Sequence, residues 1–144
     1  MSLGLSRVNA ALEALGRPDK QMDCIHVAGS NGKGSACAQL VAGLVRAGYR
    51  VGLFSSPHLV RIEERVRVDG RAISEEEFDD ALNQVKALNC ELTFFEITYL
   101  TSLIACRDAG VSIMVLETGL GGRLDATRSA DVVACLVTSV SLEH

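Results

Sequence analysis

The sequence has no long hydrophobic run, because none of its apolar stretches approaches the ~18 residues that a membrane-spanning helix needs. The N-terminal segment lacks the apolar core and the cleavage site of a secretory signal peptide. We therefore expect no membrane partner and a cytoplasmic location.

Basic residues are also scarce. The 144 residues include 14 lysines and arginines against 18 aspartates and glutamates, which gives a formal net charge of −4. A nucleic-acid-binding surface needs many cations to neutralise phosphates, so this balance argues against a nucleic-acid partner. A local basic pocket is still compatible with it.

The five cysteines show no C-x-x-C spacing, which argues against a zinc site. Most of them lie in apolar runs, so we expect small, buried hydrophobic residues in a reducing compartment. Internal repeats and low-complexity segments are absent. The length and the 48% hydrophobic content suffice for one compact domain with its own core.

Short apolar runs alternate with segments of helical spacing. The spacing predicts a helix over residues 5–15, a strand over 24–28, a helix over 36–47 and a strand over 50–56. A strand, a helix and a second strand in this order form a βαβ unit, whose strands are parallel.

The second half continues the alternation. A short exposed strand is expected within residues 66–68, and Ser74 with Glu77 forms a capping box for a polar helix that reaches residue 88. The pattern then predicts an apolar helix over 94–110 and two buried strands, over 112–118 and 132–140. We expect an α/β fold of three layers, P-loop-type, with a mostly parallel sheet. Because the chain stops directly after a strand, we expect this fold to be incomplete.

A glycine-rich segment, "VAGSNGKGSA" at residues 27–36, connects the first strand to the second helix. Glycines let successive backbone N–H groups point inward as an anion-binding nest, and the helix N-terminus adds positive potential. Lys33 supplies a cation for β- and γ-phosphates, and the Ser35 hydroxyl can ligate Mg²⁺. The spacing departs from G-x-x-x-x-G-K-[ST], and the alternative is a glycine-rich turn with an incidental lysine. The predicted ATP-binding residues are Gly29, Ser30, Asn31, Gly32, Lys33, Gly34 and Ser35.

Glu117 ends an otherwise apolar strand, "SIMVLE". A charged side chain is costly there unless it is paired or bound to a metal ion. We therefore predict that Glu117 is a magnesium ligand. The alternative is a helix cap or a solvated strand end.

Four segments together carry a family resemblance: "VAGSNGKGS", "GLFSSPHLVRIEERVRVDGRAIS", "FFE" and "VLETGLGGRLDAT". They resemble, in order, the N-terminal part of the ATPase domain of folylpolyglutamate synthase/dihydrofolate synthase, in the Mur ligase superfamily. The long second and fourth segments are specific to the folate branch. Residues 1–144 are then the N-terminal portion of the ATP-binding domain, without the rest of that domain or the C-terminal domain.

The resemblance implies an ATP-dependent carboxylate–amine ligase of folate biosynthesis. ATP phosphorylates the carboxylate of dihydropteroate or a reduced folate, and the amine of L-glutamate then displaces phosphate. The acyl phosphate is needed because an oxide would be the leaving group of a free carboxylate, and the protein contributes positioning and charge neutralisation. The full-length enzyme is expected to be a monomer, and Lys33, Glu117 and His144 are its predicted catalytic residues here.

The family's magnesium ligands fall on Ser56, Glu117 and His144. With Ser35 of the glycine loop, these residues make up the predicted magnesium site. Ser56 precedes a proline in "SSPH", and His144 closes "SVSLEH". However, "LEH" is also how a vector-derived histidine tag begins, so a tag remnant is the alternative for His144.

The pterin-side contacts of the family fall on two segments. Aromatic rings stack on flat heterocycles, and carboxylates accept hydrogen bonds from their N–H groups. The alternatives are core packing for the two phenylalanines and a turn cap for Asp125. Arg61, Arg65 and Arg67 either neutralise substrate carboxylates or form a solvated strand face. The predicted substrate-binding residues are Thr93, Phe94, Phe95, Glu96, Leu124, Asp125 and Ala126.

Some features depart from the family or leave other functions open. Arg128 stands where the family usually has asparagine, and the 144 residues lack the C-terminal contacts to glutamate and nucleotide, so we expect no ligation by this chain alone.

A Mur peptidoglycan ligase is the alternative within the superfamily, although "SSPHLVR" argues against it. A non-catalytic nucleotide-binding fragment is another. A GTPase would need an N-K-x-D-type motif, which is absent.

Overall fold

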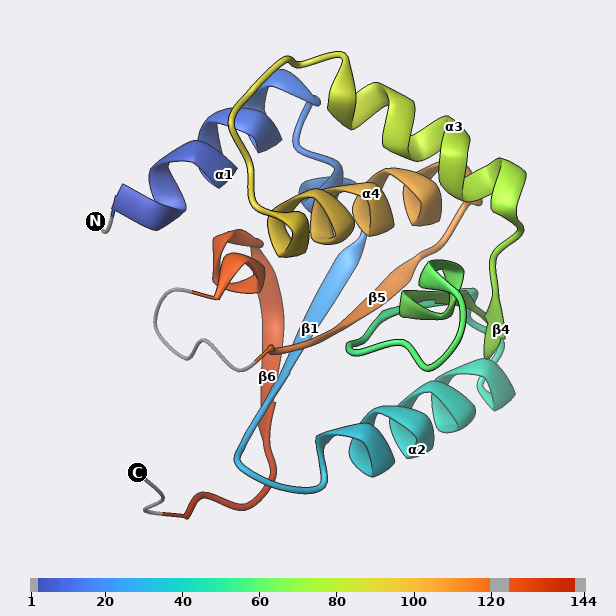
Figure 1. Ribbon diagram of the computed structural model, residues 1–144. Helices are drawn as coiled ribbons and strands as arrows, with labels where there is room; N and C mark the ends of the chain where they lie inside the picture. Colours follow the sequence, from blue (N-terminus) through green and yellow to red (C-terminus); the bar gives the residue numbers. More distant parts are fainter. Residues whose placement is uncertain (1–2, 120–124, 142–144) are drawn as a thin grey trace.

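The computed structural model describes residues 3–119 and 125–141. Its centre is a six-stranded sheet of order β4-β3-β2-β5-β1-β6 (Figure 1). The predicted α/β class and mostly parallel sheet are confirmed. The strands are β1 (Asp23–Ala28), β2 (Val51–Phe54), β3 (Val66–Val68), β4 (Arg71–Ala72), β5 (Ile113–Glu117) and β6 (Val132–Val137).

Four neighbouring strands of the sheet, β2, β5, β1 and β6, are parallel. Val27 of β1 pairs with Glu117 of β5, and Ala28 pairs with Val137 of β6. The carboxyl ends of these strands therefore meet at one edge of the sheet. In an open α/β sheet this is the edge where ligands bind.

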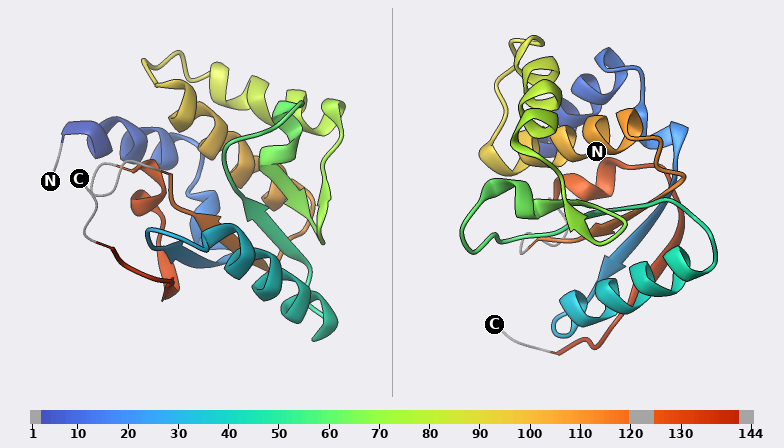
Figure 2. Two further views of the ribbon diagram at one scale, coloured as in Figure 1. Left: turned by 60° about the horizontal axis from the view of Figure 1, so that its bottom comes forward. Right: turned by 90° about the vertical axis from the view of Figure 1, so that its right-hand side faces the viewer.

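Helices cover both faces of the sheet (Figures 1 and 2). On one face, α1 (Leu3–Ala14), α3 (Glu75–Lys86) and α4 (Phe94–Asp108) share a large core with Phe54 and Met114. On the other face, α2 (Lys33–Arg46) packs Cys37 and Val41 on a smaller cluster. The three predicted layers are confirmed. The described residues also form three short 3₁₀ helices: η1 (Pro18–Gln21), η2 (Ile62–Arg65) and η4 (Ala126–Ser129).

The βαβ unit formed by β1, α2 and β2 is present, but β5 lies between its two strands. The helix also begins at Lys33, three positions before the predicted start, because Gly32 in the left-handed region forms its N-cap. The capping box of α3 is confirmed, since Ser74 Oγ accepts from the backbone N–H of Glu77 at 3.0 Å. Lys33 thus belongs to the first turn of α2.

Two predictions about strand burial are wrong. The strand over residues 66–68 is present, but Val66 is fully buried because β3 pairs antiparallel with β2 over the core of α4. In contrast, all six residues of β6 are exposed, Val133 by 66% and Val137 by 55%. Among the described residues, β6 is an edge strand with only β1 beside it. Its apolar composition had predicted burial on both faces.

The cysteines follow the prediction in part. Cys24, Cys37 and Cys106 are buried, whereas Cys90 and Cys135 are exposed, and all five are free thiols. Among the residues that the structure describes, no helix is long and apolar enough to cross a membrane.

Candidate functional site

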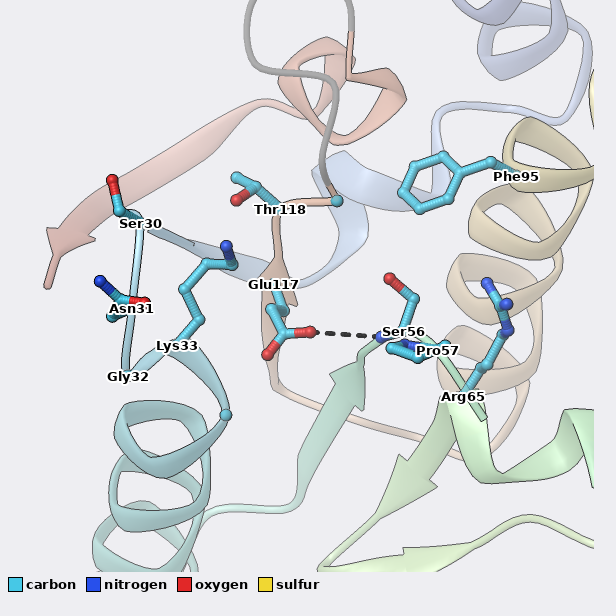
Figure 3. A pocket seen from close by; sticks show the side chains of 12 residues that line it. Ser30, Asn31, Gly32, Lys33, Ser56, Pro57, Arg65, Phe95, Glu117 and Thr118 are labelled. Atoms are coloured by element: carbon cyan, nitrogen blue, oxygen red, sulfur yellow. Dashed lines mark hydrogen bonds between the residues drawn. The ribbon is translucent and has the colours of Figure 1, made fainter. Parts of the chain in front are cut away.

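A cleft of about 580 Å³ opens at the carboxyl edge of the sheet, between the N-terminus of α2, the ends of β2 and β5, and the start of α4 (Figure 3). It brings together segments that are far apart in the sequence. Its lining residues are Ser30, Asn31, Gly32, Lys33, Gly34, Ser56, Pro57, Arg65, Phe95, Glu117, Thr118 and Gly119.

The glycine loop forms one wall of this cleft. Gly29 and Gly32 have φ values of +136° and +79°, a region that side-chain-bearing residues rarely adopt. The Lys33 ammonium group donates to the carbonyl oxygen of Gly29 at 2.9 Å, so the lysine folds back over its own loop. The first N–H groups of α2 have no partner within the helix, and they supply anion-binding capacity here.

The end of β6 holds this loop in place. The backbone N–H of Ser30 donates to the carbonyl oxygen of Ser139 at 2.7 Å, and the hydroxyl of Thr138 donates to the carbonyl oxygen of Asn31 at 2.6 Å. A Cβ atom at Gly29 would overlap the Thr138 hydroxyl. The sequence gives no local signal for this support, since more than a hundred residues separate the partners.

Glu117 faces the loop across the cleft. Its Oε1 accepts a hydrogen bond from the backbone N–H of Ser56 at 3.2 Å (Figure 3), and its Oε2 points toward the first turn of α2, 3.9 Å from where a Cβ on Gly34 would lie. Glu117 is only 6% exposed. Burial raises the pKa of its carboxyl group, and the Ser56 N–H and the Lys33 charge oppose this rise. Within the described part of the chain, Glu117 has no ion-pair partner.

The donor set around Glu117 fits a magnesium ion shared with phosphates. Mg²⁺ prefers oxygen ligands and usually keeps waters and substrate phosphates in its shell, so one carboxylate with a nearby hydroxyl is a suitable protein contribution. Glu117 and Ser56 supply this set from the ends of β5 and β2. Within the described residues, no three His, Cys, Asp or Glu side chains gather in a metal-binding group.

The other two predicted magnesium ligands are less closely placed. Ser35 is exposed in the first turn of α2 and is absent from the described lining of the cleft. His144 lies outside the described residues, so both assignments stay predictions.

The predicted pterin-binding segment at the start of α4 has a clear structural role. Thr93 and Glu96 form a capping box, in which Glu96 Oε1 accepts from the Thr93 N–H at 2.8 Å and Thr93 Oγ1 accepts from the Glu96 N–H at 3.1 Å. Phe95 lines the cleft and packs edge-on against Phe54, with centroids 5.5 Å apart. Phe94 is 57% exposed. Substrate contacts by these residues stay predictions.

Asp125 is buried, and both oxygens of its carboxylate accept hydrogen bonds from the protein. It accepts hydrogen bonds from the backbone N–H of Gly119, from the backbone N–H of Thr127 at 2.8 Å and from the Thr127 hydroxyl at 2.6 Å. This arrangement is the turn cap that was the alternative for Asp125, and a contact with substrate stays a prediction. Ala126 is buried beside it, and Leu124 lies outside the described residues.

His26 of β1 extends this network. Because the Thr127 hydroxyl donates to Asp125, its oxygen accepts the hydrogen bond from His26 Nε2 at 2.8 Å, which fixes the neutral tautomer with the proton on Nε2. Burial lowers the pKa of His26, and the Asp125 charge opposes this. The hydrogen bonds thus connect β1 with Gly119 at the cleft. Of the residues in this network, the sequence had pointed only to Asp125.

The three arginines of the "RIEERVR" segment separate in the structure. Arg65, the last residue of η2, lines the cleft, whereas Arg61 pairs with Glu63 at 2.8 Å and with Glu75 at 3.5 Å. Arg67 lies on β3 and is absent from the described lining. From the sequence alone, the same two roles had been possible for all three arginines.

Comparisons with known proteins agree with this arrangement. No protein-family model matches the chain. The chain is 41% identical over 146 residues to the dihydrofolate synthase/folylpolyglutamate synthase of Escherichia coli, covering 100% of this chain and 35% of that protein. Among solved structures, that of the bifunctional folylpolyglutamate synthase/dihydrofolate synthase of Yersinia pestis complexed with AMPPNP and Mn ion superposes with a TM-score of 0.92 and 43% identity, covering 100% of this chain and 36% of that one.

A second solved structure, E. coli FolC in complex with DHPP and ADP, also gives a TM-score of 0.92, at 41% identity over 100% of this chain and 35% of that one. The chain therefore spans about a third of the length of the relatives that it matches. By sequence and by fold it is a homologue, over its whole length, of the dihydrofolate synthase/folylpolyglutamate synthase family.

Proposed function

We propose that residues 1–144 form the N-terminal portion of the ATP-binding domain of an ATP-dependent ligase that joins L-glutamate to the carboxylate of dihydropteroate or a reduced folate. The observation that carries the proposal is the placement of Lys33 and Glu117 on one cleft. Lys33 lies in the first turn of α2, after the loop that follows β1, and Glu117 ends the neighbouring parallel strand β5. ATP and Mg²⁺ are the proposed cofactors, in line with the nucleotide and manganese complexes of the two solved relatives.

The residues have distinct roles in this proposal. The loop N–H groups and the Lys33 ammonium bind the β- and γ-phosphates, which requires Lys33 to leave the Gly29 carbonyl oxygen that it contacts. Glu117 and Ser56 hold Mg²⁺, which neutralises charge on the phosphates when bound. The buried position of Glu117 favours metal binding, because its charge has little water to stabilise it.

The chemical task explains why such a cleft is needed. A carboxylate becomes an electrophile when its oxygen attacks the γ-phosphorus of ATP, which releases ADP and leaves an acyl phosphate. The glutamate amine then attacks the acyl carbon, and the C–O bond to phosphate breaks as the amide forms. The cleft aligns the two anionic reactants and offsets their repulsion.

Three further features belong to the proposal. The substrates are small molecules, the full-length enzyme is a monomer, and neither nucleic acid nor membrane takes part. The cytoplasm is the proposed compartment, in keeping with five free thiols.

The test measures ATP-dependent incorporation of labelled L-glutamate by the full-length protein. Dihydropteroate and a reduced folate are offered as acceptors, with a UDP-muramyl peptide as the competing acceptor of a Mur-type ligase. Incorporation into a pterin acceptor supports the proposal. Incorporation into the muramyl peptide alone, or no incorporation, overturns it.

A further inference from the structure

Arg65 stands on the cleft wall opposite the glycine loop, with Ser56, Pro57 and Glu117 between the two (Figure 3). The cleft therefore has a cationic group at each end. Lys33 serves the phosphate end, which leaves the function of Arg65 to be explained.

The guanidinium of Arg65 is held from two sides. Its Nε donates to His58 Nδ1 at 2.8 Å, which requires that this ring nitrogen carry no proton. The guanidinium carbon, Cζ, lies 5.3 Å from the centroid of the Phe94 ring, which is the distance of a cation–π contact. These contacts fix the plane of the group and leave its two terminal nitrogens without a hydrogen-bond partner among the described residues.

No carboxylate of the described residues lies within ion-pair distance of Arg65, although Arg17, Arg50, Arg61 and Arg107 all have such partners. Arg65 is only half-exposed, and burial lowers its pKa. An arginine that is partly desolvated, oriented and without a counter-ion is suited to bind an anion from solution. A planar guanidinium matches a carboxylate with two parallel hydrogen bonds.

We propose that Arg65 binds the carboxylate of the acceptor substrate and holds it toward the γ-phosphate at the loop end of the cleft. The proposal rests on the proposed function and assigns a residue to the reacting group of the acceptor. Phe95, on the same wall, then lies beside the aromatic ring that bears this carboxylate. His58 and Phe94 are positioning residues, because they orient the guanidinium.

The test uses the full-length protein with AMPPNP and Mg²⁺, and measures binding of pteroic acid and of its carboxamide by calorimetry. The carboxamide keeps the shape but has no charge. Hydrogen bonds to a charged group contribute about 1.5–3 kcal/mol, so the wild type is expected to bind the acid about 10- to 100-fold more tightly than the amide. Arg65→Gln should lose this preference and keep its affinity for AMPPNP. Arg65→Lys keeps the charge but loses the planar guanidinium, so its preference for the acid should lie between those of the wild type and of Arg65→Gln.

Arg46→Gln, at the exposed far end of α2, is the matched control and should behave as the wild type. A wild type that binds both ligands without preference overturns the inference even if Arg65→Gln fails to fold. So does an Arg65→Gln variant that keeps the preference, or one whose main loss is in AMPPNP affinity. A wild type that binds neither the pteroates nor the nucleotide overturns the proposed function itself.

Discussion

The carboxylate of Glu117 accepts a hydrogen bond from the backbone N–H of Ser56, at 3.2 Å, and so links the end of β5 to the loop after β2. Glu117 is only 6% exposed, and this hydrogen bond uses its Oε1. Its Oε2 points toward the N-terminus of α2 and can still bind a cation there. This relationship underlies the metal assignment and leads to the first prediction.

Glu117→Gln should raise the Mg²⁺ concentration needed for glutamate ligation by the full-length enzyme, because it removes the charge that holds the ion and keeps the shape. Burial raises the pKa of this carboxyl group, so the ionised form destabilises the folded state at pH values above that pKa. The variant should therefore be at least as stable as the wild type at neutral pH. The measurements are a Mg²⁺ titration of activity and thermal unfolding without metal. An unchanged Mg²⁺ requirement would remove Glu117 from the metal site.

Lys33→Ala should reduce ATP-dependent ligation by the full-length enzyme about 10²-fold or more, the loss typical for one preorganised electrostatic group. Stability should change little, because the lysine contributes a single hydrogen bond, to Gly29. Steady-state kinetics and urea unfolding of the same preparation separate the two effects. Turnover close to that of the wild type would contradict the phosphate-binding role of the loop.

Gly29→Ala and Gly32→Ala form a matched pair in the same loop. Both place a side chain at positive φ, which costs on the order of 1–3 kcal/mol, and the φ of +136° at Gly29 is further from the left-handed helical region than the +79° at Gly32. Only at Gly29 does the new Cβ also overlap the Thr138 hydroxyl, whereas nothing lies within 4 Å of the new atom at Gly32. We expect a clearly larger loss of unfolding free energy and of AMPPNP affinity for Gly29→Ala. Equal losses in urea titration and calorimetry would show that neither the Thr138 contact nor the φ of +136° makes Gly29 the more constrained position.

The stability of the chain should fall as the pH decreases below about 6.5, the ordinary pKa of histidine. Burial lowers the pKa of His26 in the folded state, so between its ordinary and its lowered pKa the unfolded chain binds a proton that the folded chain does not. His26→Gln should flatten this part of the profile and keep a donor toward Thr127. Urea unfolding of both proteins from pH 8 to pH 5 is the measurement. Parallel profiles would contradict the assignment to His26.

The parts of the molecule that the sequence predicted well are those with a local signal. The glycine loop lies between β1 and α2, and the residues on either side of it were enough to predict this arrangement. Ser74 and Glu77 lie three residues apart and cap the helix that they precede. Glu117 was singled out because it was the one charged residue of an apolar run.

The parts that were predicted poorly depend on distant contacts. The burial of Val66 and the exposure of β6 follow from the order of the strands in the sheet. The hydrophobic periodicity of a sequence does not predict that order. Arg61, Arg65 and Arg67 look equivalent in the sequence, and only the position of η2 beside the cleft distinguishes Arg65. Asp125 was recognised, but no spacing rule predicts that its carboxylate accepts a hydrogen bond from the backbone N–H of Gly119.

The five thiols divide into two reactivity classes. Burial raises the pKa values of Cys24, Cys37 and Cys106 to about 12, so these thiols stay protonated and shielded at neutral pH, whereas Cys90 and Cys135 are exposed. A maleimide or disulfide reagent should therefore modify two thiols rapidly in the native chain and the other three only after unfolding. The chain thus contains its own chemical reporter of folding, with no engineered label.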